Sequence, residues 1–88
     1  MTMTTDEVRA QVLEALAQIA PELEGELATL PDEAPLREQL DLDSLDMQNL
    51  MAALHERLGV DVPERDYGRL DTLGAAVDYL RTRGAAGA

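Results

Sequence analysis

The chain has 88 residues and a mass of 9.6 kDa, the size of one small domain with a single core. It has no Cys, Trp or Phe, which excludes disulfides, thiolate metal sites and cysteine nucleophiles and predicts an aliphatic core. Eighteen acidic and seven basic residues give a net charge of −11. Nucleic acid and anionic membranes would repel this surface, so we expect neither as a partner.

The first predicted helix begins at Thr4, which forms a capping-box pattern with Glu7. Apolar residues then recur at helical spacing on one face: Val8, Val12, Ala15, Leu16 and Ile19. Pro21 ends this helix, because the residue before a proline is disfavoured in the α region. Residues 21–40 hold a glycine and two further prolines and predict a long connection, with space for a turn or two in residues 22–30.

The second predicted helix begins near Asp43 and Ser44 and stops at Gly59. We assign its apolar face to Leu45, Leu50, Met51, Leu54 and Leu58. Residues 60–63 are too short and isolated for a strand, and Pro63 is placed to open a brief helix that runs through Arg69.

Asp71 or Thr72 caps the last predicted helix, and Gly84 stops it. Its buried positions are predicted to be Leu73, Ala76, Val77 and Leu80. The pattern predicts an all-α domain: a small four-helix bundle of three longer helices and one short helix, with a long loop between the first two. We expect the domain to span residues 4–83, between a disordered start at residues 1–3 and a flexible tail at residues 84–88.

The residues suited to catalysis or metal binding are few. His55 is the single histidine, and it lies beside Glu56 and Arg57 on a helix whose apolar positions are already assigned. We therefore expect it to be a solvated surface residue. Residues 41–46 alternate carboxylates like a calcium loop, but the glycine required at position six is Asp46 and the twelfth ligand would be Ala52. We therefore expect no catalytic residue, no dedicated metal site and no enzyme.

Ser44 is open to two interpretations. Ser and Asp are both preferred N-caps, so Asp43 and Ser44 could serve only to start a helix. A helix needs one cap, however, which leaves the second residue unexplained. A hydroxyl at a helix N-terminus is exposed beside free N–H groups, which would stabilise a phosphodiester anion on Ser44 by ~0.3–1 kcal/mol.

The chain resembles the acyl carrier proteins. Residues 42–46, Leu-Asp-Ser-Leu-Asp, match the attachment motif of that family, and the likeness continues through Leu50, Leu54, residues 58–60, residues 62–63, residues 71–73 and residues 76–80. The resemblance implies that Ser44 carries covalent 4′-phosphopantetheine, installed from coenzyme A by a phosphopantetheinyl transferase. The thiol of that arm would then hold acyl groups as thioesters.

The resemblance also implies partners. Asp43 and Asp46 would meet basic residues of the transferase, and the second helix would dock acyl ligases or synthases through basic patches on those enzymes. The residues expected to bind partners are Asp43, Leu45, Asp46, Met47, Gln48, Ala52 and Glu56. The core would shelter the acyl chain. We expect a monomer, and we expect it in the cytoplasm because the first residues show no export signal.

The sequence departs from the carriers of fatty-acid synthesis in three ways. Gln48 and Asn49 stand where those carriers usually have Val and Glu. Residues 44–58 carry a net charge of only −1, whereas residues 1–43 carry −9. Asp41 also replaces the glycine that is common two residues before the motif's Asp. These departures favour a specialised carrier that serves a dedicated ligase or synthase.

Three alternatives share the same helix pattern. A peptidyl carrier usually has His where this chain has Asp43, which argues against that class. An aminoacyl or D-alanyl carrier fits better, because small cargo needs little room. A degenerate carrier would act as an unmodified helical interaction module and would keep binding its partners when Ser44 is replaced.

The charge generates the first prediction. Like-charge repulsion at −11 should lower Tm in about 10 mM salt, and raising the salt to about 150 mM, or adding Mg²⁺, should raise it by screening the acids. Thermal unfolding followed by circular dichroism measures the change. A Tm that stays constant over this range contradicts the prediction.

Overall fold

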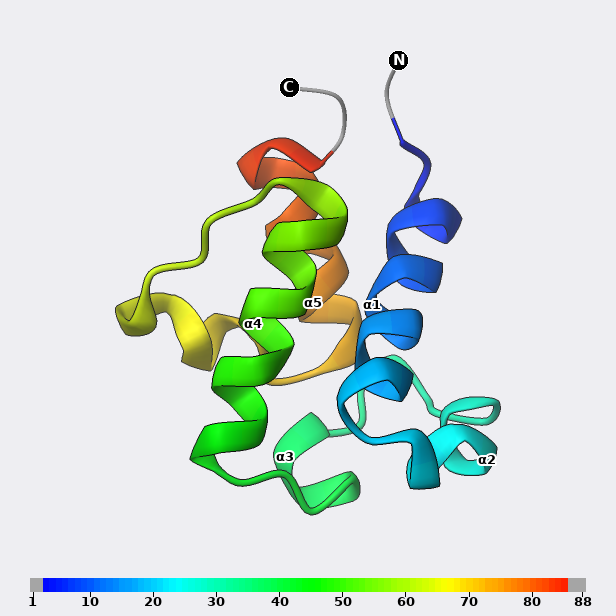
Figure 1. Cartoon of the computed structure of the whole chain (residues 1–88). Helices are drawn as coiled ribbons and strands as arrows, with labels where there is room; N and C mark the ends of the chain where they lie inside the picture. The colour runs from blue at the N-terminus through cyan, green and yellow to red at the C-terminus, as the bar shows by residue number, and fades with distance from the viewer. Residues whose placement is uncertain (1–2, 86–88) are drawn as a thin grey trace.

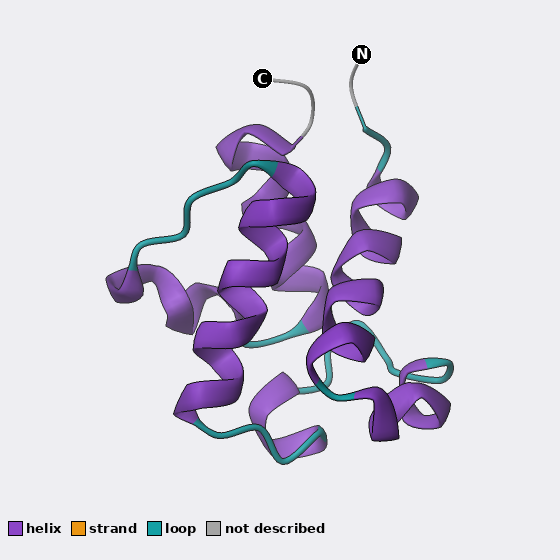
Figure 2. Ribbon diagram, viewed as in Figure 1, coloured by secondary structure: helices purple, strands orange, loops and turns teal. Residues whose placement is uncertain are grey.

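The computed structural model describes residues 3–85, and within this range the chain is helical with no strand (Figure 2). The helices in chain order are α1 (Thr5–Ile19), the 3₁₀ turn η1 (Pro21–Leu23), α2 (Glu24–Leu27), α3 (Leu36–Gln39), α4 (Ser44–Leu58), the 3₁₀ helix η2 (Glu64–Leu70), α5 (Leu73–Leu80) and the π-helical turn η3 (Arg81–Ala85). The predicted all-α bundle is confirmed. Residues 1–2 and 86–88, part of the expected terminal segments, lie outside the described residues, and Met3 is half-buried against the core.

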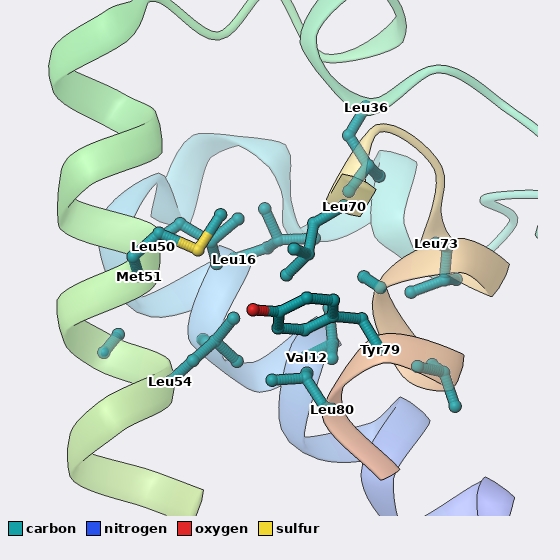
Figure 3. Close-up of a cluster of buried hydrophobic side chains, with 14 of the residues drawn as sticks. Val12, Leu16, Leu36, Leu50, Met51, Leu54, Leu70, Leu73, Tyr79 and Leu80 are labelled. Carbon is teal, nitrogen blue, oxygen red and sulfur yellow. The ribbon is translucent and has the colours of Figure 1, made fainter. Parts of the chain in front are cut away.

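Three helices surround the core. α1 packs against both α4 and α5, and the short helices close the sides and one end of the bundle (Figure 1). The largest fully buried side chains are aliphatic, as predicted: Val8, Val12, Leu16, Leu36, Leu50, Leu54, Leu70, Leu73 and Leu80. Figure 3 shows the members from α1, α4 and α5 converging on one another. Their burial is the main favourable term for a domain without disulfides.

The caps form where the sequence predicts them. The Thr4 hydroxyl accepts a 3.1 Å hydrogen bond from the Glu7 amide, and the Glu7 carboxylate accepts one of 2.9 Å from the Thr4 amide. Of the two candidates before α5, Thr72 is the cap, because its hydroxyl accepts from the amide of Ala75. Gly59 ends α4 in the left-handed region at φ 70°, which a glycine adopts without strain.

Three local predictions are wrong. Leu45 is 63% exposed and is not part of the apolar face of α4. It precedes Leu50 by five residues, and at 3.6 residues per turn this spacing puts the two side chains on different sides of the helix. The one-turn helix α3 was not expected, since four residues are too few to show a helical period. Helical winding also continues past Gly84 as far as Ala85.

The long connection between α1 and α4 is packed against the bundle at several points. The Arg9 guanidinium lies 2.9 Å from the Asp32 carboxylate, and the backbone oxygen of Asp32 accepts from the amide of Gly74. The Leu36 amide donates a 2.7 Å bond to the backbone oxygen of Asp71. These contacts fix the end of the connection relative to α5, and so fix the approach to α4.

Tyr79 is the large aromatic side chain of the core. Only 5% of its surface is exposed, and its hydroxyl donates a 2.7 Å hydrogen bond to the Asp66 carboxylate of η2. The guanidinium groups of Arg69 and Arg83 lie 5.3 and 5.4 Å from its ring centroid. The hydrogen bond from Tyr79 holds the pKa of Asp66 below its ordinary value, while burial and the same bond raise the pKa of Tyr79.

These shifts predict a pH dependence of stability. The depressed pKa of Asp66 means that its ionised form stabilises the fold above about pH 4, and this contribution is lost as the pH falls toward the folded pKa. The raised pKa of Tyr79 stabilises the fold below about pH 10, and this contribution is lost above that value. Tyr79→Phe should lower the free energy of unfolding at pH 7 and flatten its dependence on pH at both ends.

Urea unfolding between pH 3 and pH 10.5 measures this effect. Tyr67→Phe is the matched control, because Tyr67 is only partly buried and its hydroxyl has no hydrogen bond within the described range. Parallel pH profiles for wild type and Tyr79→Phe would rule out the coupling between Asp66 and Tyr79.

Candidate functional site

Ser44 occupies the first position of α4, and its side chain is exposed. The cap of this helix is Asp43, whose carboxylate accepts a 2.8 Å hydrogen bond from the Asp46 amide. The Asp46 carboxylate in turn accepts a 3.1 Å bond from the Asp43 amide, which completes a capping box. The Ser44 hydroxyl has no hydrogen-bond partner among residues 3–85, so helix initiation does not occupy it.

The segment before Ser44 is held by alternating buried side chains. Leu40 and Leu42 are 4% and 6% exposed, and the Leu42 amide donates to the backbone oxygen of Arg37 at 2.9 Å. Asp41 stands between them in the left-handed region, at φ 54°, the only described non-glycine residue with positive φ. The backbone therefore makes a sharp turn at Asp41, between α3 and α4. These two helices meet at the end of the molecule opposite the starts of α1 and η3 (Figure 1).

A pocket of about 270 Å³ opens beside Ser44. It lies between α3, the first turn of α4 and η2, and its wall includes Arg37, Met47, Gln48, Tyr67 and Gly68. Apolar and polar groups are therefore both available next to the Ser44 hydroxyl. The pocket has the size of a small organic group rather than of a long chain.

The structure places the predicted partner-binding residues in three settings. Exposed side chains form a stripe along the outer face of α4: Leu45, Gln48, Ala52 and Glu56. Asp43 and Asp46 flank Ser44 and hold the cap. Met47 does not join them, because it is 4% exposed and packs in the core on the same side as Leu50 and Met51.

His55 is exposed on α4, and residues 3–85 hold no group of three His, Cys, Asp or Glu side chains arranged to bind a metal ion. Within the same residues no helix is both long and apolar enough to span a bilayer.

A sequence-family profile described as "Phosphopantetheine attachment site" matches residues 10–80, most of the chain and all of the Ser44 region. The chain belongs to this family. The acyl carrier protein of Acidothermus cellulolyticus is 34% identical over 73 residues, which cover 82% of this chain and 87% of that protein. The acyl carrier protein of Rubrobacter xylanophilus is 32% identical over 73 residues, with 82% and 90% covered.

A solved structure supports the same fold. The acyl carrier protein from Enterococcus faecalis superposes with a TM-score of 0.72 at 24% identity, covering 93% of this chain and all of that one. The resemblance to the acyl carrier proteins is thus confirmed, and with it the phosphopantetheine cofactor of the family. Members of this family carry groups for other proteins, so the chain is a carrier rather than an enzyme.

The sequence did not predict the pocket residues outside α4. Tyr67 and Gly68 are more than twenty residues from Ser44, and no local pattern links a 3₁₀ helix to a distant helix start. Arg37 has a signal in the sequence, because it is the only arginine between Arg9 and Arg57. A lone arginine in so acidic a stretch identifies Arg37 as a candidate for binding an anion.

The left-handed turn predicts the effect of replacing Asp41. Asp and Asn tolerate this conformation, whereas Ala adopts it at a cost of about 1–2 kcal/mol. Asp41→Asn removes the charge and keeps the tolerance, so it serves as the reference. We expect Asp41→Ala to be less stable than Asp41→Asn by about 1 kcal/mol and Asp41→Gly to be at least as stable, measured by urea unfolding. Equal stability of the Ala and Asn variants would argue against strain at this turn.

Proposed function

We propose that Ser44 is the attachment residue for 4′-phosphopantetheine, and that the protein carries acyl groups as thioesters on this arm. The observation that supports the proposal is the exposed Ser44 hydroxyl at the start of α4, which has no hydrogen-bond partner within residues 3–85 because Asp43 supplies the cap. Ser44 is also the only serine of the chain. The pathway that we propose is fatty acid, polyketide or specialised lipid synthesis.

The residues around Ser44 fit the group. The first turn of α4, a helix of fifteen residues, offers amide N–H groups and the positive end of its dipole to a phosphodiester anion. The adjoining pocket has room for part of the arm or for a small acyl group. When attached, the arm supplies a thiol that forms and exchanges thioesters; the protein supplies the fixed anchor point and the surface that partners recognise.

A phosphopantetheinyl transferase is the partner that we propose for loading, with coenzyme A as donor in the cytoplasm. Asp43 and Asp46 are the carboxylates nearest to Ser44 in sequence and suit a basic surface on that enzyme. The net charge of −11 disfavours self-association, which supports a monomer.

The outer face of α4 is the proposed docking surface for an acyl ligase or synthase. Leu45 is its exposed apolar residue, and Gln48 and Ala52 follow on the same stripe. Arg57 does not contribute to this face, because its guanidinium lies against α1, 3.6 Å from Glu14. A partner would therefore meet an apolar and amide surface with one carboxylate, Glu56, which supports a dedicated partner rather than one selected by a row of acids.

Intact-mass spectrometry tests the attachment site. Wild type, incubated with coenzyme A and a broad-specificity transferase, should gain the mass of one phosphopantetheine, and Ser44→Ala should gain none. Thr29→Ala, which also removes an exposed hydroxyl, should load like wild type. A gain of one phosphopantetheine mass by Ser44→Ala would assign the attachment to another residue. A wild type that stays unmodified would contradict the carrier proposal.

A further inference from the structure

Arg37 is the one basic residue in the wall of the pocket beside Ser44. It projects from α3, and its side chain is exposed. The ion pairs of the described residues are Arg9 with Asp32 at 2.9 Å, Arg57 with Glu14 at 3.6 Å and Arg83 with Asp66 at 3.8 Å. Arg37 takes part in none of them, so its guanidinium is available to an anion in the pocket.

The backbone of Arg37 is held firmly. Leu36 on one side is fully buried, and its amide is bonded to the backbone oxygen of Asp71. The carbonyl of Arg37 accepts the hydrogen bond of the Leu42 amide, in the segment that leads to Ser44. The α3 backbone is thus tied to the same turn that delivers Ser44, which limits how far the two residues can move apart.

A phosphodiester on Ser44 would add a negative charge where acids already gather. Asp41, Asp43 and Asp46 precede or follow Ser44 within three residues, and Glu64 and Asp71 contribute to the pocket wall. Charges this close together are within one Debye length of each other at physiological salt. The dipole of α4 offsets part of the repulsion, and among the described residues Arg37 is the only cation of the pocket wall that can offset more.

We propose that Arg37 is the anion-binding residue of the Ser44 pocket, and that its guanidinium pairs with the phosphodiester of the phosphopantetheine arm. This inference rests on the proposed attachment at Ser44. A planar guanidinium binds two phosphate oxygens at once, so the pair fixes direction as well as distance. It would hold the first group of the arm toward α3 and η2, and so direct the rest of the arm along the pocket instead of into solvent.

The experiment compares apo protein with protein that carries the bare arm, and wild type is also prepared with a succinyl-loaded and a butyryl-loaded arm. Wild type, Arg37→Gln, Arg37→Lys and Arg81→Gln are loaded from coenzyme A, and loading is confirmed by intact mass. Arg81→Gln is the matched control, since it removes an exposed charge from η3 at the far end of the molecule. NMR follows the Arg37 side-chain Nε–Hε resonance, assigned by its absence in Arg37→Gln, and thermal unfolding gives Tm in about 10 mM and 500 mM salt.

We expect loading to shift the Arg37 resonance in wild type, with a smaller shift in high salt. We expect the Tm of the loaded form, relative to apo, to be lower in Arg37→Gln than in wild type by about 1–5 °C at low salt. Arg37→Lys should recover part of this difference, and Arg81→Gln should match wild type.

Four outcomes overturn the inference. One is an Arg37 resonance that loading leaves unmoved. A second is a change in Tm on loading that is the same in Arg37→Gln and wild type. A third is a resonance that moves with a succinyl-loaded arm but with neither the bare arm nor a butyryl-loaded arm, which would assign Arg37 to a cargo carboxylate. The last is an Arg37→Gln protein that folds but does not load, which would assign Arg37 to the transferase contact. Wild type that gains no arm contradicts the proposed function itself, which separates the two failures.

Discussion

The reciprocal cap between Asp43 and Asp46 is the interaction on which the site depends. Each carboxylate accepts a hydrogen bond from the backbone amide of the other residue, so both orphan amides are satisfied without Ser44. The same two bonds put the N-cap of α4 at Asp43, one residue before Ser44, and thereby place the Ser44 hydroxyl on the first turn, in solvent. A serine that served as the cap itself would have its oxygen engaged by an amide and would be a poorer point of attachment.

Elements with strong local signals were predictable from the sequence. The Thr4 capping box, the stop at Gly59 and the spacing of buried residues in α5 each depend on residues within one or two turns of one another. Leu45 was misassigned because leucine suggests burial, although its angular position on α4 lies away from the core stripe. The one turn of α3 and the pocket wall formed by η2 depend on tertiary packing, which no local pattern records.

The residues of the candidate site also divide into those that the sequence predicts and those that it does not. Ser44 and its flanking acids were predictable, because a cap pattern and a family motif coincide in five consecutive residues. Met47 lies next to that motif yet faces inward, so proximity in sequence did not establish exposure. The exposed stripe of α4 follows from helical geometry once the buried face is known, and Arg57 is withdrawn from it by hydrogen bonds to Gln11 and Gln18 of α1.

The segment from α3 to Asp41 leads directly to the start of α4. Its leucines are buried and fix the backbone, while the side chains of Arg37 and Asp41 are exposed. A glycine at position 41 would relieve the left-handed strain and remove one negative charge near Ser44. An acid at 41 and an arginine at 37 instead place opposite charges at the two ends of one short turn, one at the approach to Ser44 and one in the adjoining pocket wall. The inner side chains of this segment therefore position Ser44, and its outer side chains set the electrostatic field that an anionic group on Ser44 would meet.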